Sequence, residues 1–106
     1  MDIEKIRREK FPVNNARVLR AINTLRTRYV RISDLNYALT PEVNSSEITD
    51  SVNYLSEGGY IKLRDIESHS EVSDFADAEP NTLEAKLTQK GIMFLNCKIN
   101  DPCIRL

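Results

Sequence analysis

The clearest pattern of apolar and polar residues lies between positions 45 and 57. Ile48, Val52 and Leu55 fall on one face of a helix that advances 100° per residue, and the opposite face is polar. Good N-cap types stand at its start, namely Asn44, Ser45 and Ser46, and Glu47 three residues after Asn44 fits a capping box. A pair of glycines follows the segment. The pattern predicts a helix over 45–57 that buries one face and presents a polar one.

Three further helices are expected along the chain. An apolar stripe predicts a helix that is capped by Asn14 or Asn15 and continues to about position 27. A second helix is expected to start at its N-cap, Ser33, and to end near Thr40, because a proline follows. Thr88 is expected to cap the last helix, which carries an apolar inner face.

Alternating side chains predict two strands of an antiparallel ribbon, at 60–66 and 83–87, with residues 29–32 as a third strand edge. The segment 67–82 between the two strands is polar and acidic. Its composition favours a mobile hairpin loop over packed structure. The predicted fold class is therefore α+β: mainly α with a small antiparallel β-ribbon.

The 106 residues are enough for one domain with a modest core, which we place at 14–96. Residues 1–13 are interpreted as a basic arm or short helix that ends at Pro12. This arm is either loosely held or docked on another subunit, and its thin apolar content favours the former. Residues 97–106 are interpreted as an extended C-terminal tail.

The net charge of −1 conceals a strong segregation of charge. Residues 1–31 carry nine Lys/Arg against three acids, residues 32–85 carry two against twelve, and residues 86–106 carry four against one. The middle of the chain is therefore acidic, and both ends are basic. Such asymmetry says more about binding partners than the total charge does.

The order of elements resembles the winged helix-turn-helix superfamily over roughly residues 14–96. The resemblance is carried by ISDLNYAL for the second helix, NSSEITDSVNYLSEGGYI for the third helix and first wing strand, and LEAKLTQKGIMFL for the returning strand and last helix. The phrase AKLTQKG is similar to the strand-to-helix junction of bacterial regulators of the MarR and PadR kind. The wing loop would be about 67–82.

The resemblance implies a small DNA-binding protein, a transcriptional regulator of bacterial or phage type, that reads double-stranded DNA with helix 45–57. Ser45, Ser46, Thr49 and Asn53 would then face the groove, with Asp50 beside them. Tyr54 would either touch the partner or pack against the second helix, and packing is favoured. Phosphate contacts are expected from the cationic residues outside that helix: Arg28, Arg31, Lys62 and Arg64.

The sequence departs from this pattern because the helix 45–57 contains no Lys or Arg and the wing loop is acidic. An acidic surface repels phosphate, so a second interpretation stays open: a winged-helix module that binds another protein through its acidic face, without DNA. A homodimer is also expected, and its contact elements would be residues 1–10 of the arm and residues 98–106 of the tail.

Other classes of function find little support in the sequence. There is no Gly-rich phosphate loop or nucleophile elbow, so an enzyme is not expected, and no cofactor or metal site is predicted. His69 is interpreted as an ordinary surface residue, and Cys97 and Cys103 as reduced thiols. No apolar run approaches the ~20 residues that span a bilayer, so no membrane association is expected and the cytoplasm is the predicted location.

Overall fold

The computed structural model describes residues 3–24, 28–73, 75, 78–96 and 100–106. Its elements are, in order, α1 (Ile3–Asn23), β1 (Val30–Arg31), α2 (Ile32–Leu39), α3 (Ser45–Glu57), β2 (Ile61–Asp65), β3 (Glu71–Val72), the 3₁₀ turn η2 (Pro80–Thr82), β4 (Leu83–Leu87) and α4 (Gln89–Asn96). The strands form one antiparallel sheet in the order β1-β4-β2-β3. The predicted α+β class is confirmed, and so is the strand edge at β1.

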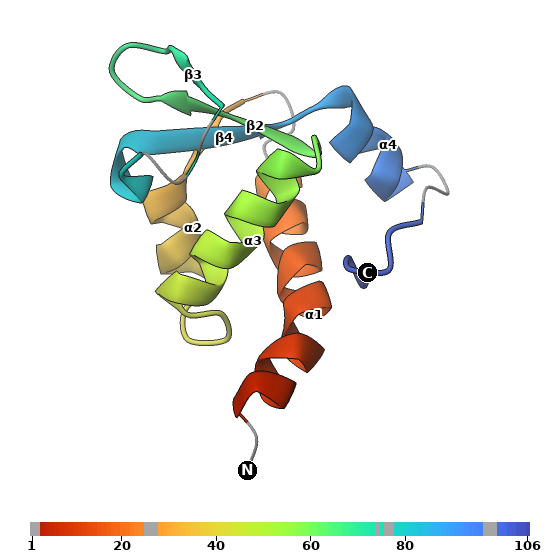
Figure 1. Cartoon of the computed structure of the whole chain (residues 1–106). Coiled ribbons are helices and arrows are strands. Elements are labelled where there is room, and N and C mark those ends of the chain that lie inside the picture. The colour runs from red at the N-terminus through yellow and green to blue at the C-terminus, as the bar shows by residue number, and fades with distance from the viewer. Residues whose placement is uncertain (1–2, 25–27, 74, 76–77, 97–99) are drawn as a thin grey trace.

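Helices α1, α2 and α3 lie on one face of the sheet (Figure 1). Ile61 and Leu63 of β2 point to that side and are buried in one core with the apolar faces of the helices. Because successive side chains of a strand point to opposite faces, Lys62 and Arg64 lie on the other face. We call that other face the outer face of the sheet.

Helix α3 forms as the apolar pattern predicts. Ile48, Val52 and Leu55 are fully buried. Asn44 caps the helix in a reciprocal capping box, in which the backbone N–H of Glu47 donates to Asn44 Oδ1 at 2.9 Å and the Asn44 N–H donates to Glu47 Oε1 at 3.1 Å. The position of the polar face of α3 is therefore fixed by both its core contacts and its cap.

Helix α1 is continuous through Pro12, so the prediction that a helix ends there is wrong. The predicted N-cap role of Asn14 or Asn15 is also wrong, since both lie inside the helix and are buried. Asn15 Nδ2 donates to the carbonyl of Cys103 at 2.9 Å, and Asn14 Nδ2 donates to Glu47 Oε2 at 3.1 Å. Long-range contacts thus use the two asparagines that local preference assigns to a helix start.

Tertiary contacts hold the first half of α1 in place despite the proline. A proline in a helix interior costs about 3 kcal/mol because it removes a hydrogen bond and crowds the preceding turn. The Phe11 ring packs edge-on against Tyr54 of α3, with 5.3 Å between centroids, and Lys10 Nζ lies 2.9 Å from Glu47 Oε2. Residues 10–13 are therefore docked on α3, which corrects their interpretation as loosely held.

Helix α2 begins before its predicted N-cap. Ser33 lies within the helix, and the N-cap position is occupied by Arg31, whose side chain makes no capping hydrogen bond. The C-terminal boundary at Thr40 is confirmed. The start moves because Ile32 is fully buried in the core and enters the helix directly from β1.

The acidic segment 67–82 is more structured than its composition predicts. Residues 71–72 pair with β2 as β3, where Val72 lies opposite Leu63. Phe75 is 7% exposed and belongs to the core, and η2 precedes β4. The prediction of a mobile loop without packed structure is wrong for these residues, because two apolar side chains are enough to anchor the segment.

The C-terminal residues 100–106 pack against the body, so the prediction of an extended tail is wrong for them. The Asp101 carboxylate accepts hydrogen bonds from the hydroxyls of Tyr60 (2.6 Å) and Tyr54 (2.9 Å). The backbone N–H of Arg105 donates to the Pro12 carbonyl at 2.9 Å. Tyr54 therefore packs against Phe11 of α1 and is bonded to the C-terminal segment.

These contacts also change the acidity of the groups involved. Burial opposes ionisation of Asp101, but hydrogen bonds from Tyr60, Cys103 N and Tyr54 lower its pKa below the ordinary value. Burial and the Asp101 carboxylate raise the pKa of Tyr60 to about 12, and they raise the pKa of Tyr54 as well. Asp101 is therefore an ionised anchor that ties residues 100–106 to α3 and to the start of β2.

Candidate nucleic-acid interface

The outer face of the sheet carries one row of alternating charges. The strand register places Arg31 of β1 opposite Glu84 of β4, Glu84 opposite Arg64 of β2, and Arg64 opposite Glu71 of β3. Cross-strand neighbours of opposite charge stabilise a sheet by a few tenths to 1 kcal/mol per pair. This row is therefore largely compensated within the protein.

The neighbouring row is not compensated. Lys62 of β2 lies directly opposite Lys86 of β4, an arrangement of like charges that disfavours the sheet unless an anion binds there. Lys62 is exposed, and so is Arg31 on β1, the edge strand that pairs with β4. We define the basic sheet face as Arg31, Lys62, Arg64 and Lys86. Arg28, also exposed, lies two residues before β1.

Arg64 is held in a fixed position on this face. Its Nε lies 2.6 Å from Glu84 Oε1, and its guanidinium carbon lies 3.7 Å from the centroid of the Tyr29 ring. Lys86 Nζ lies 5.8 Å from the same centroid. Such cation–π contacts are worth about 0.5–1 kcal/mol at exposed sites. Tyr29 thus serves as a platform that gathers two of the cations.

The candidate residues of α3 are engaged within the chain. Ser45 Oγ donates to Asn36 Oδ1 at 3.2 Å, Thr49 Oγ1 donates to the Ser45 carbonyl at 3.0 Å, and Ser46 Oγ donates to Asn44 Oδ1 at 2.9 Å. A hydroxyl has one proton to donate, and a phosphate oxygen only accepts. These three side chains can therefore bind phosphate only after giving up a bond inside the protein.

The outer side of α3 is also electrostatically unfavourable for DNA. Asp50 and Glu57 are exposed there, and α3 contains no Lys or Arg. Asn53 is half-buried and lines a cavity with Phe75 and Pro80. The described acids of the 67–79 segment, including Glu67 and Glu79, are exposed as well.

The two groups of predicted DNA contacts lie on different surfaces. Three of the four basic candidates lie on the outer face of the sheet, while α3 lies against the inner face (Figure 1). The structure therefore does not bring Ser45, Ser46, Thr49 and Asn53 together with Arg31, Lys62 and Arg64.

The sequence analysis missed two residues of the basic sheet region, Lys86 and Tyr29. The signal for Lys86 was present, since it alternates with Ala85 and Leu87 and must therefore point away from the core. Tyr29 gives no comparable signal. Its role depends on Arg64 coming from a distant strand, which no local pattern reports.

Comparison with known proteins adds no assignment: no family model matches the chain, and neither curated proteins nor solved structures match it. Within the described residues, no helix is long and apolar enough to cross a bilayer. The same part of the chain holds no group of three His, Cys, Asp or Glu side chains that could bind a metal ion. The site must therefore be interpreted from its own geometry.

Proposed function

We propose that this chain is a winged helix-turn-helix protein that binds double-stranded DNA and acts in transcriptional regulation. The order α1-β1-α2-α3-β2-β4-α4 supports this, together with the central position of β4 between β1 and β2. In this arrangement α2 and α3 form the helix pair, and the β2–β3 hairpin with the segment before β4 forms the wing.

The proposal differs from the expected mode of binding in one respect: the basic sheet face, and not α3, contacts the phosphates. The observation that carries it is the uncompensated Lys62–Lys86 row, flanked by Arg31 and Arg64. Released counterions supply most of the affinity in non-specific DNA binding, so the cationic face is favoured over the acidic one. Arg28 extends the same charge beyond β1.

A homodimer would double this surface. Ile3 of the projecting end of α1 is 70% exposed, Ile6 is 39% exposed and Leu106 is 53% exposed, which are large values for apolar side chains. We propose these residues as the dimer contact. Two basic sheet faces would then be available to one duplex.

Binding of a protein partner is the second candidate function. Asp50 and Glu57 on the outer side of α3 are exposed and have no ion pair within the part of the chain that the structure describes. A basic protein surface would complement them. This candidate predicts a protein complex that forms without DNA.

The experiment is fluorescence anisotropy with a labelled random-sequence duplex at about 50 mM and about 200 mM salt. Each neutralised phosphate contributes about −0.9 to the log–log slope, so the three cations outside the compensated row, Arg28, Lys62 and Lys86, give about −3 for one chain and up to twice that for a dimer. We expect Lys62→Gln with Lys86→Gln to weaken binding about tenfold at low salt and to reduce the slope by about 2.

The matched control is Asp50→Asn, which also changes the charge of an exposed side chain but on α3. We expect its DNA affinity and salt slope to equal those of the unmodified protein. If DNA instead lies against α3, Asp50→Asn strengthens binding, because a repelling charge is removed, and the double lysine variant has little effect. Absence of binding at low salt would leave the protein-partner function as the better account.

A further inference from the structure

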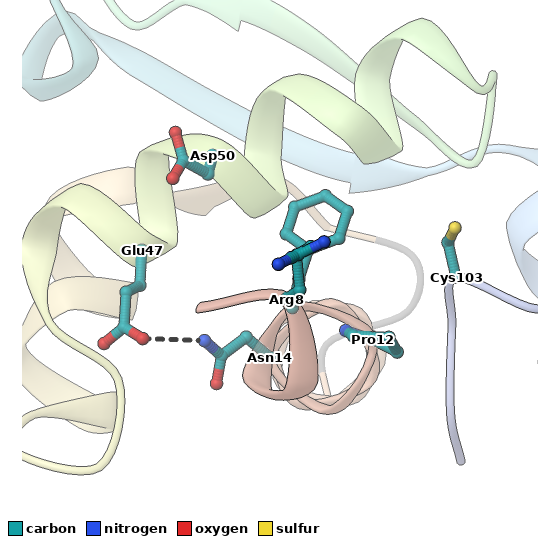
Figure 2. Close-up of a pocket in the computed structure, with 7 residues that line it drawn as sticks. Arg8, Pro12, Asn14, Glu47, Asp50 and Cys103 are labelled. Carbon is teal, nitrogen blue, oxygen red and sulfur yellow. Dashed lines mark hydrogen bonds between the residues drawn. The ribbon is translucent and has the colours of Figure 1, made fainter. Parts of the chain in front are cut away.

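A cavity of about 390 Å³ lies where α1, α3 and the C-terminal segment meet. Phe11 and Pro12 of α1 form an apolar wall, and Cys103 closes the cavity on the C-terminal side. Glu47 and Asp50 of α3 and Arg8 of α1 also line it, and in Figure 2 the Glu47 carboxylate points toward Asn14 while the Asp50 carboxylate points away from Asn14. Its size and its mixture of apolar walls with a few polar groups are typical of sites for small molecules.

Two of the lining charges are available to a ligand. Glu47 is already occupied, since it bonds Lys10, Asn14 and the Asn44 N–H. Arg8 and Asp50, by contrast, have no side-chain hydrogen bond or ion pair to any residue that the structure describes. The cavity therefore presents one free cation from α1 and one free carboxylate from α3.

A buried amide marks the same place. Asn14 lines the cavity and is only 3% exposed. Its Nδ2 donates to Glu47, while its Oδ1 accepts no hydrogen bond from the described residues. A buried acceptor without a donor is unfavourable, but this oxygen has almost no accessible surface, so a ligand N–H group bonds it only if the amide turns toward the cavity.

We propose that this cavity binds a small zwitterion of the α-amino acid type with an aromatic or branched apolar side chain. The ligand carboxylate pairs with the Arg8 guanidinium, whose planar donors suit a carboxylate. The ligand ammonium pairs with the Asp50 carboxylate. The apolar side chain lies against Phe11 and Pro12.

The proposal goes beyond DNA binding and does not depend on it, because the cavity lies on the helical side of the molecule, away from the basic sheet face. Binding joins α1, α3 and the C-terminal segment. A ligand that binds only the folded state raises the apparent stability according to its concentration relative to Kd.

The experiment uses the full chain and isothermal titration with four probes: L-phenylalanine, L-leucine, phenylalanine amide, which lacks the carboxylate, and 3-phenylpropanoate, which lacks the ammonium. For ligands this small we expect a Kd of about 1 mM or tighter for at least one of the two amino acids. We expect each single-charge analogue of phenylalanine to bind about tenfold more weakly than an amino acid that retains both charges.

Two variants assign the charges. Arg8→Gln should bind phenylalanine no better than its amide, and Asp50→Asn should bind phenylalanine no better than 3-phenylpropanoate. Arg17→Gln, an exposed arginine of the same helix, should leave all four affinities unchanged. All three positions are exposed, and circular dichroism checks that each variant folds. The proposal is overturned if neither amino acid binds. It is also overturned if both charge variants still bind phenylalanine more tightly than its two single-charge analogues.

Discussion

A Gly91→Ala variant is expected to lose about 3 kcal/mol of unfolding free energy. A Cβ at this position would lie 2.2 Å from the carbonyl oxygen of Tyr60 and 3.1 Å from its carbonyl carbon. The clash is with backbone, and that oxygen is fixed because it accepts the N–H of Thr88 at 3.0 Å. The methyl group fits only if α4 moves away from the start of β2.

Urea unfolding followed by circular dichroism measures this loss. Gly59→Ala is the matched control, since Gly59 has a φ of 80° but its Cβ position makes only an ordinary contact, 3.9 Å from Lys90 Cδ. Backbone strain alone should cost that variant about 1 kcal/mol. A Gly91→Ala protein no less stable than Gly59→Ala would show that α4 is not packed against Tyr60 as described.

An Asp101→Asn variant is expected to lose about 2 kcal/mol of unfolding free energy at neutral pH. The reason is that two tyrosine hydroxyls and the Cys103 N–H donate hydrogen bonds to the carboxylate that the substitution removes. The loss should depend on pH. The folded state lowers the pKa of Asp101, so its contribution is complete above the unfolded value of about 3.9 and disappears as the pH falls through the lower folded value.

Chemical unfolding at several pH values tests this prediction. The difference in unfolding free energy between the unmodified protein and Asp101→Asn should be constant from neutral pH to about pH 5 and should become smaller below about pH 4. Asp34→Asn, at an exposed position of α2, is the control and should change stability little at any pH. A difference between the two proteins that persists unchanged into acid would contradict the role of the ionised carboxylate.

The parts of the fold that local sequence predicts are those whose signals agree. In α3 the apolar spacing of Ile48, Val52 and Leu55, the Asn44 cap and the following glycines all indicate the same helix, and the structure confirms it. The strand at 83–87 has the predicted bounds because strict alternation specifies which side chains face the core.

The predictions that proved wrong all depended on contacts distant in the sequence. Pro12 and Asn14 carry local signals for a helix boundary, but docking on α3 keeps α1 continuous. Phe75 orders a segment whose composition favours disorder, since its side chain is buried in the core. Asp101 secures a segment with no regular pattern, because two tyrosines far away in the sequence donate to it.

The candidate site shows the same division. Alternation places Lys62 and Lys86 on the outer face of the sheet, so the cationic face could be predicted from the sequence. The separation of this cationic face from the polar face of α3 could not be predicted from the sequence, because the separation depends on which face of the sheet the helices cover. The fixed position of Arg64 between Glu84 and Tyr29 likewise required the register of three strands.

The central claim, that DNA lies against the basic sheet face, is tested most directly by lysine acetylation of the unmodified protein with and without duplex DNA, read by mass spectrometry. Lys10 is an internal reference for α3, because its Nζ lies 2.9 Å from Glu47. We predict that bound DNA slows acetylation of Lys62 and Lys86 and leaves Lys10 and Lys90 unchanged. Protection of Lys10 with no change at Lys62 and Lys86, under conditions where anisotropy shows binding, would contradict the claim and place the DNA on α3.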